Sequence, residues 1–489
     1  MNFRERNGGG PADRAGPPAD VLDQGPFGIE QDEGWRTALA ARPTAEPVRN
    51  PGLGIVGYAW EEAGPSIAAR EGRESLERHV QKLAALPFVD VLYIRCDWRD
   101  VQRRPGRLDL SPVWRLARSA AAAHGLRIAF RVMMSNTVGQ PGRLAIPDFL
   151  VDRVPCPVVG RLPAGDMREP AYGHPAFQAA FRELNGLLAA EFDGDPLVEF
   201  VDLMMYGFWG EGHTHTFPAP FPDLAAARDT FLAMTTFQLE TWKQAPLAVN
   251  MQPDISAVGN REVQRLAIGA GCWLRTDSVL VEEPEQVDAI AGRPATAAAV
   301  LEDGYHRRYG LEPDTAAALE RTMGHALDMG ANYWSLWTEA DALAAWQERR
   351  PDAFSGMRAR LGYRVRPAWA WQRTRGGGTE IVVAVSNDGV AGVPGTLRLA
   401  VEAPDGRLLR AGSLDAGHPH PGRLRLASLP LPAGPAPDGA WPAVRLRAEI
   451  EMKAGVRRPV RWACAEADAD GTVVVPLAPP GDPSFRKGV

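Results

Sequence analysis

The chain has 489 residues, of which 45% are hydrophobic and 23% charged, a composition typical of a globular protein with a large core. Its 54 Lys and Arg against 60 Asp and Glu give a net charge of −6, so no overall basic field exists to hold nucleic acid or an anionic membrane. No apolar run approaches the ~18 residues of a membrane span, and the first thirty residues lack the apolar stretch of a secretory signal.

The first 362 residues show two textures. Residues 1–45 are rich in Gly, Pro, Asp and Arg, which predicts a disordered or loosely attached N-terminal arm. From Asn50, short apolar runs alternate with Ala/Leu/Arg segments of helical period, the pattern of repeated βα units. The predicted strands are Gly54–Trp60, Val91–Cys96, Arg127–Met134, Val198–Tyr206, Leu247–Met251, Cys272–Thr276, Ala297–Leu301 and Tyr333–Trp337. Eight strands with intervening helices over about 300 residues predict a (β/α)8 TIM barrel across residues 46–362.

Two of the intervening helices carry clear end signals. Ser111 and Pro112 open a predicted helix that ends before Gly125. Asp314–Met329 repeats this design, with Gly330 directly after its end.

After about Tyr363, short alternating strands are separated by Gly, Pro, Asp and Asn. This pattern predicts a small antiparallel β-sandwich over residues 363–480, followed by a C-terminal tail at residues 481–489. Alternation of charged and aliphatic residues along residues 444–449 predicts one solvated and one buried face. We expect the sandwich to pack on the barrel away from the carboxyl ends of its strands and to supply no catalytic group.

The carboxyl ends of barrel strands meet at one face, where the active site of such a fold lies. We therefore take the polar and aromatic residues at and just after the eight strand ends as the candidate site. They are Tyr58, Arg95, Trp98, Arg131, Asn136, Tyr206, Trp209, Glu211, His213, Asn250, Asp277, Glu302, Tyr305, Trp334, Trp337 and Glu339.

Two carboxylates of this set, Glu211 after the fourth strand and Glu302 at the seventh, come from opposite sides of the ring. Acid-catalysed cleavage of a glycosidic bond needs one protonated carboxyl group at the leaving oxygen and one ionised carboxylate at the anomeric carbon. Sugars also stack on Trp and Tyr, while Arg, Asn and Asp bind their hydroxyl groups. The set therefore favours a carbohydrate or glycoside substrate.

Several segments resemble the clan-A retaining glycoside hydrolases, in particular the β-galactosidase-like branches. RNPGLGIVGYAW, YIRCDWRDVQRRPGRLDL and LRIAFRVM resemble the W-x-x-x-E-x-x-x-G-x-(F/L)-D pattern at the start of those branches. YGFWGEGH resembles the strand-four G-x-W-G-E-W-H element of barrel proteins that also carry a C-terminal β-sandwich. LGYR followed by SNDGVAGV resembles the start of a C-terminal sandwich. The resemblance covers roughly residues 50–400 and implies a β-glycosidase that works through a covalent glycosyl-enzyme.

The resemblance also implies roles for single residues. Glu211 matches the acid/base, Glu302 matches the nucleophile, and Arg95 and Arg131 match the arginines kept near the nucleophile. We expect the two carboxyl groups about 5–5.5 Å apart and expect Glu211 to hold a proton near neutral pH. The pattern departs from the family at Gly210, where the clan has an Asn that binds the 2-hydroxyl. Either another residue, such as Asn250 or His213, supplies that contact, or the substrate differs at that position. Glu283 and Glu339 are rival nucleophiles.

Two other functions remain open. One is a catalytically inactive carbohydrate-binding barrel, and the other is a metal-dependent hydrolase or lyase using Glu211, His213 and His215 of the EGHTH segment. The leading reading needs no cofactor and no metal, and the G-x-G-x-x-G match at residues 52–57 follows no strand and opens no helix, so it predicts no dinucleotide site. Four widely spaced cysteines without a C-x-x-C pair favour a cytoplasmic protein, for which a homo-oligomer stays open.

Overall fold

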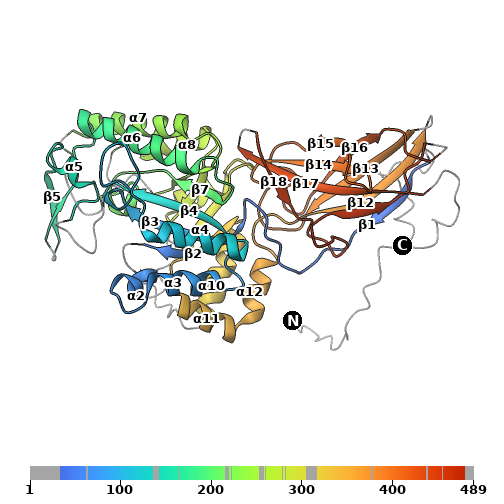
Figure 1. Ribbon diagram of the computed structural model, residues 1–489, viewed down its shortest axis with the longest axis horizontal. Coiled ribbons are helices and arrows are strands. Elements are labelled where there is room, and N and C mark those ends of the chain that lie inside the picture. The colour runs from blue at the N-terminus through green and yellow to red at the C-terminus, as the bar shows by residue number, and fades with distance from the viewer. Residues whose placement is uncertain are drawn as a thin grey trace, which may run out of the picture.

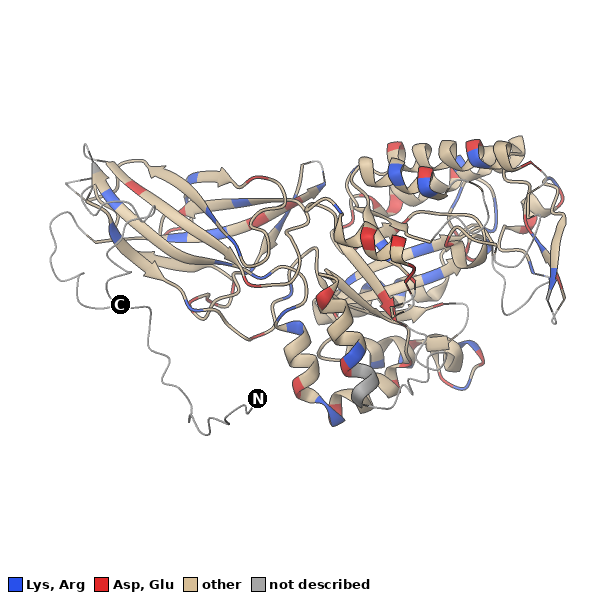
Figure 2. Ribbon diagram, turned by 180° about the vertical axis from the view of Figure 1, so that it is seen from behind, with Lys and Arg blue, Asp and Glu red and all other residues tan. Residues whose placement is uncertain are grey.

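The computed structural model describes residues 34–478 in two lobes, a barrel and a β-sandwich, arranged along the long axis of the molecule (Figure 1). The gaps within this range are residues 62–63, 136–142, 163–164, 215–219, 222, 253–257, 259, 278, 281, 304–315, 376–377, 437–438 and 454. Acidic and basic residues alternate on the helices around the barrel (Figure 2). Among the described helices, none combines the length and the apolar character that crossing a lipid bilayer would require.

Eight parallel strands close into a barrel, as the sequence predicts. In order around the barrel they are β2 (Gly54–Trp60), β3 (Val91–Asp97), β4 (Arg127–Met133), β7 (Val198–Asp202), β8 (Leu247–Asn250), β9 (Trp273–Thr276), β10 (Ala299–Asp303) and β11 (Tyr333–Leu336). The fourth strand ends at Asp202, four residues before the predicted end. The residues after it turn into a loop that carries Glu211.

Helices surround this barrel. The described helices are α2 (Ile67–Arg70), α3 (Leu76–Ala84), α4 (Pro112–His124), α5 (Asp148–Val151), α6 (Pro175–Phe192), α7 (Leu224–Thr241), α8 (Asn260–Gly269), α9 (Pro284–Ala291), α10 (Ala316–Asp328), α11 (Ala340–Arg349) and α12 (Pro351–Arg358), with 3-10 turns η2 (Gly64–Ser66), η3 (Trp98–Asp100) and η4 (Phe208–Gly210). The short strands β5 (Val158–Leu162) and β6 (Gly165–Arg168) form a hairpin. The predicted glycines after α4 and α10 are confirmed, because Gly125 and Gly330 adopt φ +63° and +66° just beyond the two helices. The predicted start of the second helix at Asp314 lies outside the described residues.

Alternation along the strands sorts their side chains into two layers. Outward-facing residues pack with the helices in the larger core. Inward-facing residues form a smaller cluster in the barrel, which includes Tyr58, Tyr93, Phe200, Trp273 and Tyr333. The side chains two residues further along each strand also point inward, and they lie at the carboxyl end of the barrel.

Two antiparallel sheets form the sandwich. One has the order β1 (Arg36–Ala40), β12 (Val365–Arg375), β13 (Gly378–Asn387) and β16 (Leu424–Leu431); the other has β15 (Leu408–Ser413), β14 (Thr396–Glu402), β17 (Ala443–Lys453) and β18 (Val456–Val460), with β19 (Val473–Pro476) also paired to β17. The predicted alternation is confirmed on β17, where Val444, Leu446 and Ala448 are buried in the core between the sheets.

One strand of the sandwich comes from the segment that the sequence assigns to a loose arm. Arg36–Ala40 forms β1, which pairs antiparallel with β12 from Arg36 opposite Gln372 to Ala40 opposite Trp369. A segment of five residues is too short to show a clear alternation of apolar and polar residues within the surrounding Gly- and Pro-rich chain. Its strand conformation is recognised from its pairing with β12.

The sandwich meets the barrel at the amino ends of the barrel strands. Arg458 on β18 donates through Nη1 to Glu199 Oε2 at 2.9 Å, and Glu199 is the second residue of β7 and fully buried. Gly52 N–H donates to Glu199 Oε1 at 2.7 Å, and Arg127 Nε lies 3.3 Å from Oε2. The junction is therefore a buried, charged contact at the end of the barrel away from the strand ends.

Candidate active site

Three arginines and three carboxylates form a closed ring of ion pairs inside the carboxyl end of the barrel. Its members, in order, are Glu302, Arg275, Asp202, Arg131, Glu211 and Arg95, and we call it the charge ring. All six side chains are at least nine-tenths buried. Charges alternate around the ring, so it carries no net charge, as burial of so many ions requires.

Strand register explains why the ring needs a carboxylate at Glu211. Arg95 on β3 and Arg131 on β4 lie directly opposite each other in the barrel, so their like charges are neighbours. Glu211 Oε1 lies 3.3 Å from Arg95 Nη1 and 2.9 Å from Arg131 Nη1. One carboxylate oxygen thus lies between the two guanidinium groups and reduces the repulsion between them.

Glu302 lies on the inner face of β10, in register with Ser335 of β11. Both Arg275 and Tyr58 donate hydrogen bonds to its Oε2, and Arg275 Nη2 also donates to Tyr58 Oη at 2.9 Å. Burial, and then the charge of Glu302, raise the pKa of Tyr58 well above its ordinary value, so the phenol stays protonated and donates. Glu302 Oε1 has a weaker neighbour, Arg95 Nη1 at 3.9 Å.

The loop that carries Glu211 is folded back tightly on itself. Phe208 N–H donates to the His213 carbonyl at 2.8 Å, and Gly212 N–H donates to the Tyr206 carbonyl at 2.9 Å. Gly207 has φ +74°, and a Cβ there would lie 1.9 Å from the His213 carbonyl oxygen. Only glycine allows this closure, which fixes Glu211 under the strand ends.

Glu211 is an ionised carboxylate in this setting. Burial alone would raise its pKa, but the contact with His213 and the charges of Arg131 and Arg95 outweigh burial and lower the pKa to about 2. His213 Nε2 lies 3.6 Å from Glu211 Oε2. The expectation that Glu211 holds a proton near neutral pH was therefore wrong, because the sequence did not show that two arginines meet at this carboxylate.

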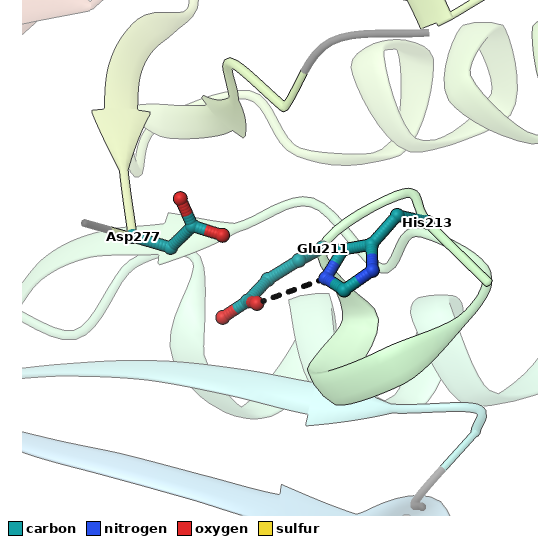
Figure 3. A group of neighbouring side chains, drawn as sticks. All are labelled: Glu211, His213 and Asp277. Atoms are coloured by element: carbon teal, nitrogen blue, oxygen red, sulfur yellow. Dashed lines mark ion pairs between the residues drawn. The ribbon is translucent and has the colours of Figure 1, made fainter. Parts of the chain in front are cut away.

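A different carboxyl group beside Glu211 has the opposite character. Asp277 follows β9 and lies close to Glu211 and His213 (Figure 3). One carboxylate oxygen of Asp277, one of Glu211 and one ring nitrogen of His213 all lie within 4.8 Å of one another. Burial and then the charge of Glu211 raise the pKa of Asp277 to about 7; His213 opposes this and Glu302 adds to it. Asp277 is thus half protonated near neutral pH.

The structure brings many of the predicted residues together and places others elsewhere. Those gathered around the charge ring are Tyr58, Arg95, Arg131, Trp209, Glu211, His213, Asn250, Asp277, Glu302 and Trp337. Trp98, Tyr206 and Trp334 are instead fully buried in the core between strands and helices. Glu339 is exposed at the start of α11. Asn136, Tyr305 and His215 lie outside the described residues.

Direction along the strand explains these differences. Tyr333 points into the barrel, so its neighbour Trp334 must point outward to the helices, where it packs with Phe354. Trp98 begins the turn η3 and stacks edge-on against Phe177 of α6. Its indole therefore belongs to the helix layer.

Two members of the charge ring, Asp202 and Arg275, were not among the residues predicted from the sequence. Arg275 lies two residues before Asp277 and two after the inward-facing Trp273, so period-two alternation on the sixth strand could have found it. Asp202 was hidden because the fourth strand was expected to continue to Tyr206. Its true end at Asp202 puts that carboxylate between Arg131 and Arg275.

A scan against protein-family models finds no match, and a search of curated proteins finds none either. Solved structures do resemble the chain. The catalytic domain of a β-amylase from Paenibacillus polymyxa has 9% identity and a TM-score of 0.41, over 60% of this chain and 97% of that one. Endo-glycoceramidase II from Rhodococcus sp. has 13% identity and a TM-score of 0.38, over 81% and 100%.

A β-galactosidase from the psychrophilic Marinomonas ef1 has 11% identity and a TM-score of 0.37, over 58% of this chain and 54% of that one. The chain thus spans about half the length of that enzyme.

Proposed function

We propose that this protein is a retaining β-glycoside hydrolase, with Glu302 as the nucleophile and Glu211 on the opposite side of the scissile bond. The observation that supports it best is the nitrogen that both glutamates share. Glu211 Oε1 and Glu302 Oε1 lie 3.3 and 3.9 Å from Arg95 Nη1, so these two oxygens are at most about 7 Å apart. That limit includes the ~5–5.5 Å of retaining enzymes and leaves out most of the ~6.5–9.5 Å range of inverting ones.

The contacts of Glu302 suit a nucleophile. Its Oε2 accepts hydrogen bonds from Arg275 and Tyr58, which hold the carboxylate in one orientation. Its Oε1 is the less engaged oxygen and is the one that faces Arg95 and the Glu211 side. We therefore expect Oε1 to attack the anomeric carbon, while the charge of Glu302 is stabilised through Oε2.

Buried hydrogen-bond donors around the charge ring suit the hydroxyl groups of a sugar. Asn250 Nδ2, Arg275 Nη1 and Trp337 Nε1 are buried and donate to no described residue. Asn250 ends β8 two residues after the inward-facing Ala248, so its amide points into the barrel. It is our candidate for the 2-hydroxyl contact, because Gly210, with φ +71°, has no side chain to offer.

A metal-dependent mechanism is the competing candidate, since Glu211, His213 and Asp277 offer three closely spaced ligand atoms. Arg131 and Arg95 oppose it, because a cation bound to Glu211 would lie next to two guanidinium groups that already compensate its charge. We therefore assign no metal to the site.

The test is replacement of the nucleophile. Glu302→Ala should lower kcat on a 2,4-dinitrophenyl β-glycoside by about 10⁴-fold or more, since no covalent intermediate can form. Added azide should enter the cavity and restore part of the rate, giving a glycosyl azide of inverted configuration. EDTA should leave the wild-type rate unchanged.

Glu339→Ala is the matched control, because Glu339 is an exposed carboxylate outside the charge ring. Its rate should stay within about twofold of wild type. Loss of rate in Glu339→Ala with a near-normal Glu302→Ala would reassign the nucleophile. A wild type that turns over no glycoside of a gluco-, galacto- and mannoside panel would favour the carbohydrate-binding barrel.

A further inference from the structure

We propose that Asp202 is a positioning residue of the active site: one of its oxygens holds two arginines of the charge ring in the orientations that the two glutamates require. The inference rests on the proposed function and names the buried group that couples the two sides of that site. The side chain of Asp202 is only 2% exposed, so Asp202 acts through the arginines and not by touching the substrate.

The first argument is the set of contacts at Asp202 Oδ2. Asp202 ends β7, and groups from three other strands of the barrel meet at this one oxygen. Tyr93 on β3 donates its hydroxyl to the oxygen at 2.5 Å. Arg131 on β4 lies 3.1 Å from it through Nε and 3.0 Å through Nη2, and Arg275 on β9 lies 3.5 Å from it through Nε. Asp202 Oδ2 therefore connects β3, β4 and β9 inside the barrel.

The second argument is the orientation of the two guanidinium groups. A guanidinium group is planar and its N–H donors point in fixed directions, so the edge that one partner binds determines where the other edge points. Arg131 turns Nε and Nη2 to Asp202, and its Nη1 donates to Glu211 at 2.9 Å. Arg275 turns Nε to Asp202, and its Nη2 donates to Glu302. Asp202 thus sets the direction in which each arginine presents a donor to a glutamate.

The third argument is charge. With Asp202, three arginines of the charge ring face three carboxylates; without its charge, three arginines would face two. The transition state of glycoside cleavage carries positive charge around the anomeric carbon, whereas the bound glycoside is uncharged. An excess positive charge in a buried site disfavours the transition state and not the bound glycoside. Asp202 should therefore contribute to kcat and little to KM.

Tyr93 supports Asp202 from the neighbouring part of the barrel. Burial raises the pKa of the Tyr93 hydroxyl well above its ordinary value, so the hydroxyl stays protonated and donates to Asp202. Cζ of Arg275 lies 4.7 Å from the centroid of the Tyr93 ring, so the same side chain also supports one of the two arginines. A phenylalanine at this position would keep the ring and remove only the hydrogen bond to Asp202.

The main experiment replaces Asp202 with the isosteric amide. Asp202→Asn should lower kcat on a 2,4-dinitrophenyl β-glycoside by about 10²-fold, because the arginines lose their fixed orientation and the ring gains excess positive charge. KM should stay within about twofold of the wild type. Calorimetric titration should show that a protonated iminosugar of the same configuration binds at least about tenfold more weakly, while the uncharged monosaccharide binds as before.

Glu199→Gln is the matched control. Glu199 lies three residues earlier on β7, is fully buried and pairs with the two arginines Arg127 and Arg458, but at the amino end of the barrel. Urea denaturation should show that both variants lose stability. Glu199→Gln should nevertheless keep the kcat and the iminosugar affinity of the wild type. An equal fall of kcat in Glu199→Gln and Asp202→Asn would overturn the inference, because loss of any buried carboxylate of β7 would then have the same effect.

Tyr93→Phe is a milder variant that tests the same contact, and it decides the question if Asp202→Asn does not fold. It should lower kcat by about three- to tenfold at an unchanged KM. In the Asp202→Asn background, removal of the Tyr93 hydroxyl should have no further effect on kcat, because the hydroxyl acts through the carboxylate. Independent effects of the two changes would overturn the inference.

Two further outcomes separate this inference from the proposed function. Wild-type kcat and iminosugar affinity in Asp202→Asn, or in Tyr93→Phe where only that variant folds, would overturn the inference alone. A wild type that cleaves no glycoside would overturn the proposed function, and the inference with it.

Discussion

Two carboxyl groups less than 5 Å apart, Glu211 and Asp277, show how strongly neighbours decide protonation. Glu211 is the more deeply buried, and burial favours the neutral acid, yet its pKa is the one that is lowered. The contact with His213 and the charges of Arg131 and Arg95 reverse the effect of burial. Asp277 has no arginine partner among the described residues. Burial raises its pKa, and the negative charge of Glu211 raises it further.

This difference predicts a pH dependence of stability. The pKa of Asp277 is raised to about 7 in the folded protein from about 3.9 in the unfolded chain. The folded state therefore binds the proton more tightly, and the free energy of unfolding should fall as pH rises from about 4 to about 7. Urea denaturation at several pH values should show that the free energy of unfolding falls less steeply with pH in Asp277→Asn than in the wild type. The stability of this variant relative to the wild type should therefore increase as pH rises.

Glu169→Gln should show a change of the same sign, because its pKa is raised as well. Glu339→Gln serves as the exposed control and should follow the wild-type curve. Parallel curves for the wild type and Asp277→Asn would mean that Asp277 is ionised throughout this range.

At the level of elements, the periodicity of the sequence was enough to place all eight barrel strands and the sandwich after residue 363, but not β1. It was enough because inward and outward faces of these strands are both buried, which gives continuous apolar runs. The site was harder to predict. Glu211, Glu302 and the two arginines Arg95 and Arg131 follow from strand ends, but the ion pairs that close the ring connect strands distant in sequence.

The loop after β7 shows the same limit. Its sequence, YGFWGEGH, predicts a glycine-rich turn, but not that three of its glycines and Trp209 adopt positive φ. Trp209, at φ +55°, is a strained conformation for a bulky residue, and its carbonyl accepts a hydrogen bond from Arg131 Nη1 at 3.1 Å. The hydrogen bond from Arg131 of the charge ring stabilises this strained conformation. Sequence periodicity does not reveal that contact.

The closure of this loop predicts the effect of Gly207→Ala. A Cβ at Gly207 would lie 1.9 Å from the His213 carbonyl oxygen, so the loop must open and Glu211 must leave Arg131. We expect a loss of roughly 2–4 kcal/mol in the free energy of unfolding and at least a ~10²-fold fall in kcat.

Gly186→Ala is the matched control for this substitution. Gly186 lies inside α6 with no atom within 4 Å of its would-be Cβ, so alanine should stabilise the protein by roughly 0.5–1 kcal/mol and leave kcat unchanged. Thermal unfolding and steady-state kinetics on the same preparations measure both effects. A Gly207→Ala protein with wild-type stability would show that the loop closes in another way.

On the scale of the whole molecule, the barrel has two charged ends with separate tasks. The charge ring occupies the carboxyl end, and Glu199 with Arg458 and Arg127 occupies the amino end. Among the described residues, those that hydrogen-bond or ion-pair with the side chains of Glu211 and Glu302 all belong to the barrel. The sandwich thus contributes an ion pair at the amino end of the barrel and no contact to the two glutamates at the carboxyl end.

Arg458→Met tests this division. It should lower the free energy of unfolding by about 2–4 kcal/mol, because Glu199 is fully buried and loses a charge-assisted hydrogen bond from the sandwich. Calorimetry should show separate transitions for the barrel and the sandwich, while kcat of the folded protein stays unchanged. Arg457→Met is the matched control: its ion pair with Glu451 is half exposed and 3.7 Å long, so its loss should cost less than about 1 kcal/mol. A fall in kcat in Arg458→Met would mean that the sandwich acts on the catalytic end.

The pairing of β1 with β12 has a consequence for synthesis of the chain on the ribosome. Arg36 pairs with Gln372, so β1, once it has left the exit tunnel, must wait for about 330 further residues before its partner exists. At ordinary elongation rates that delay is on the order of tens of seconds, long enough for the whole barrel to fold in between. The sandwich is therefore completed after the barrel, by the pairing of a strand that was made before it. A nascent chain stalled before residue 365 would hold a barrel with β1 still unpaired.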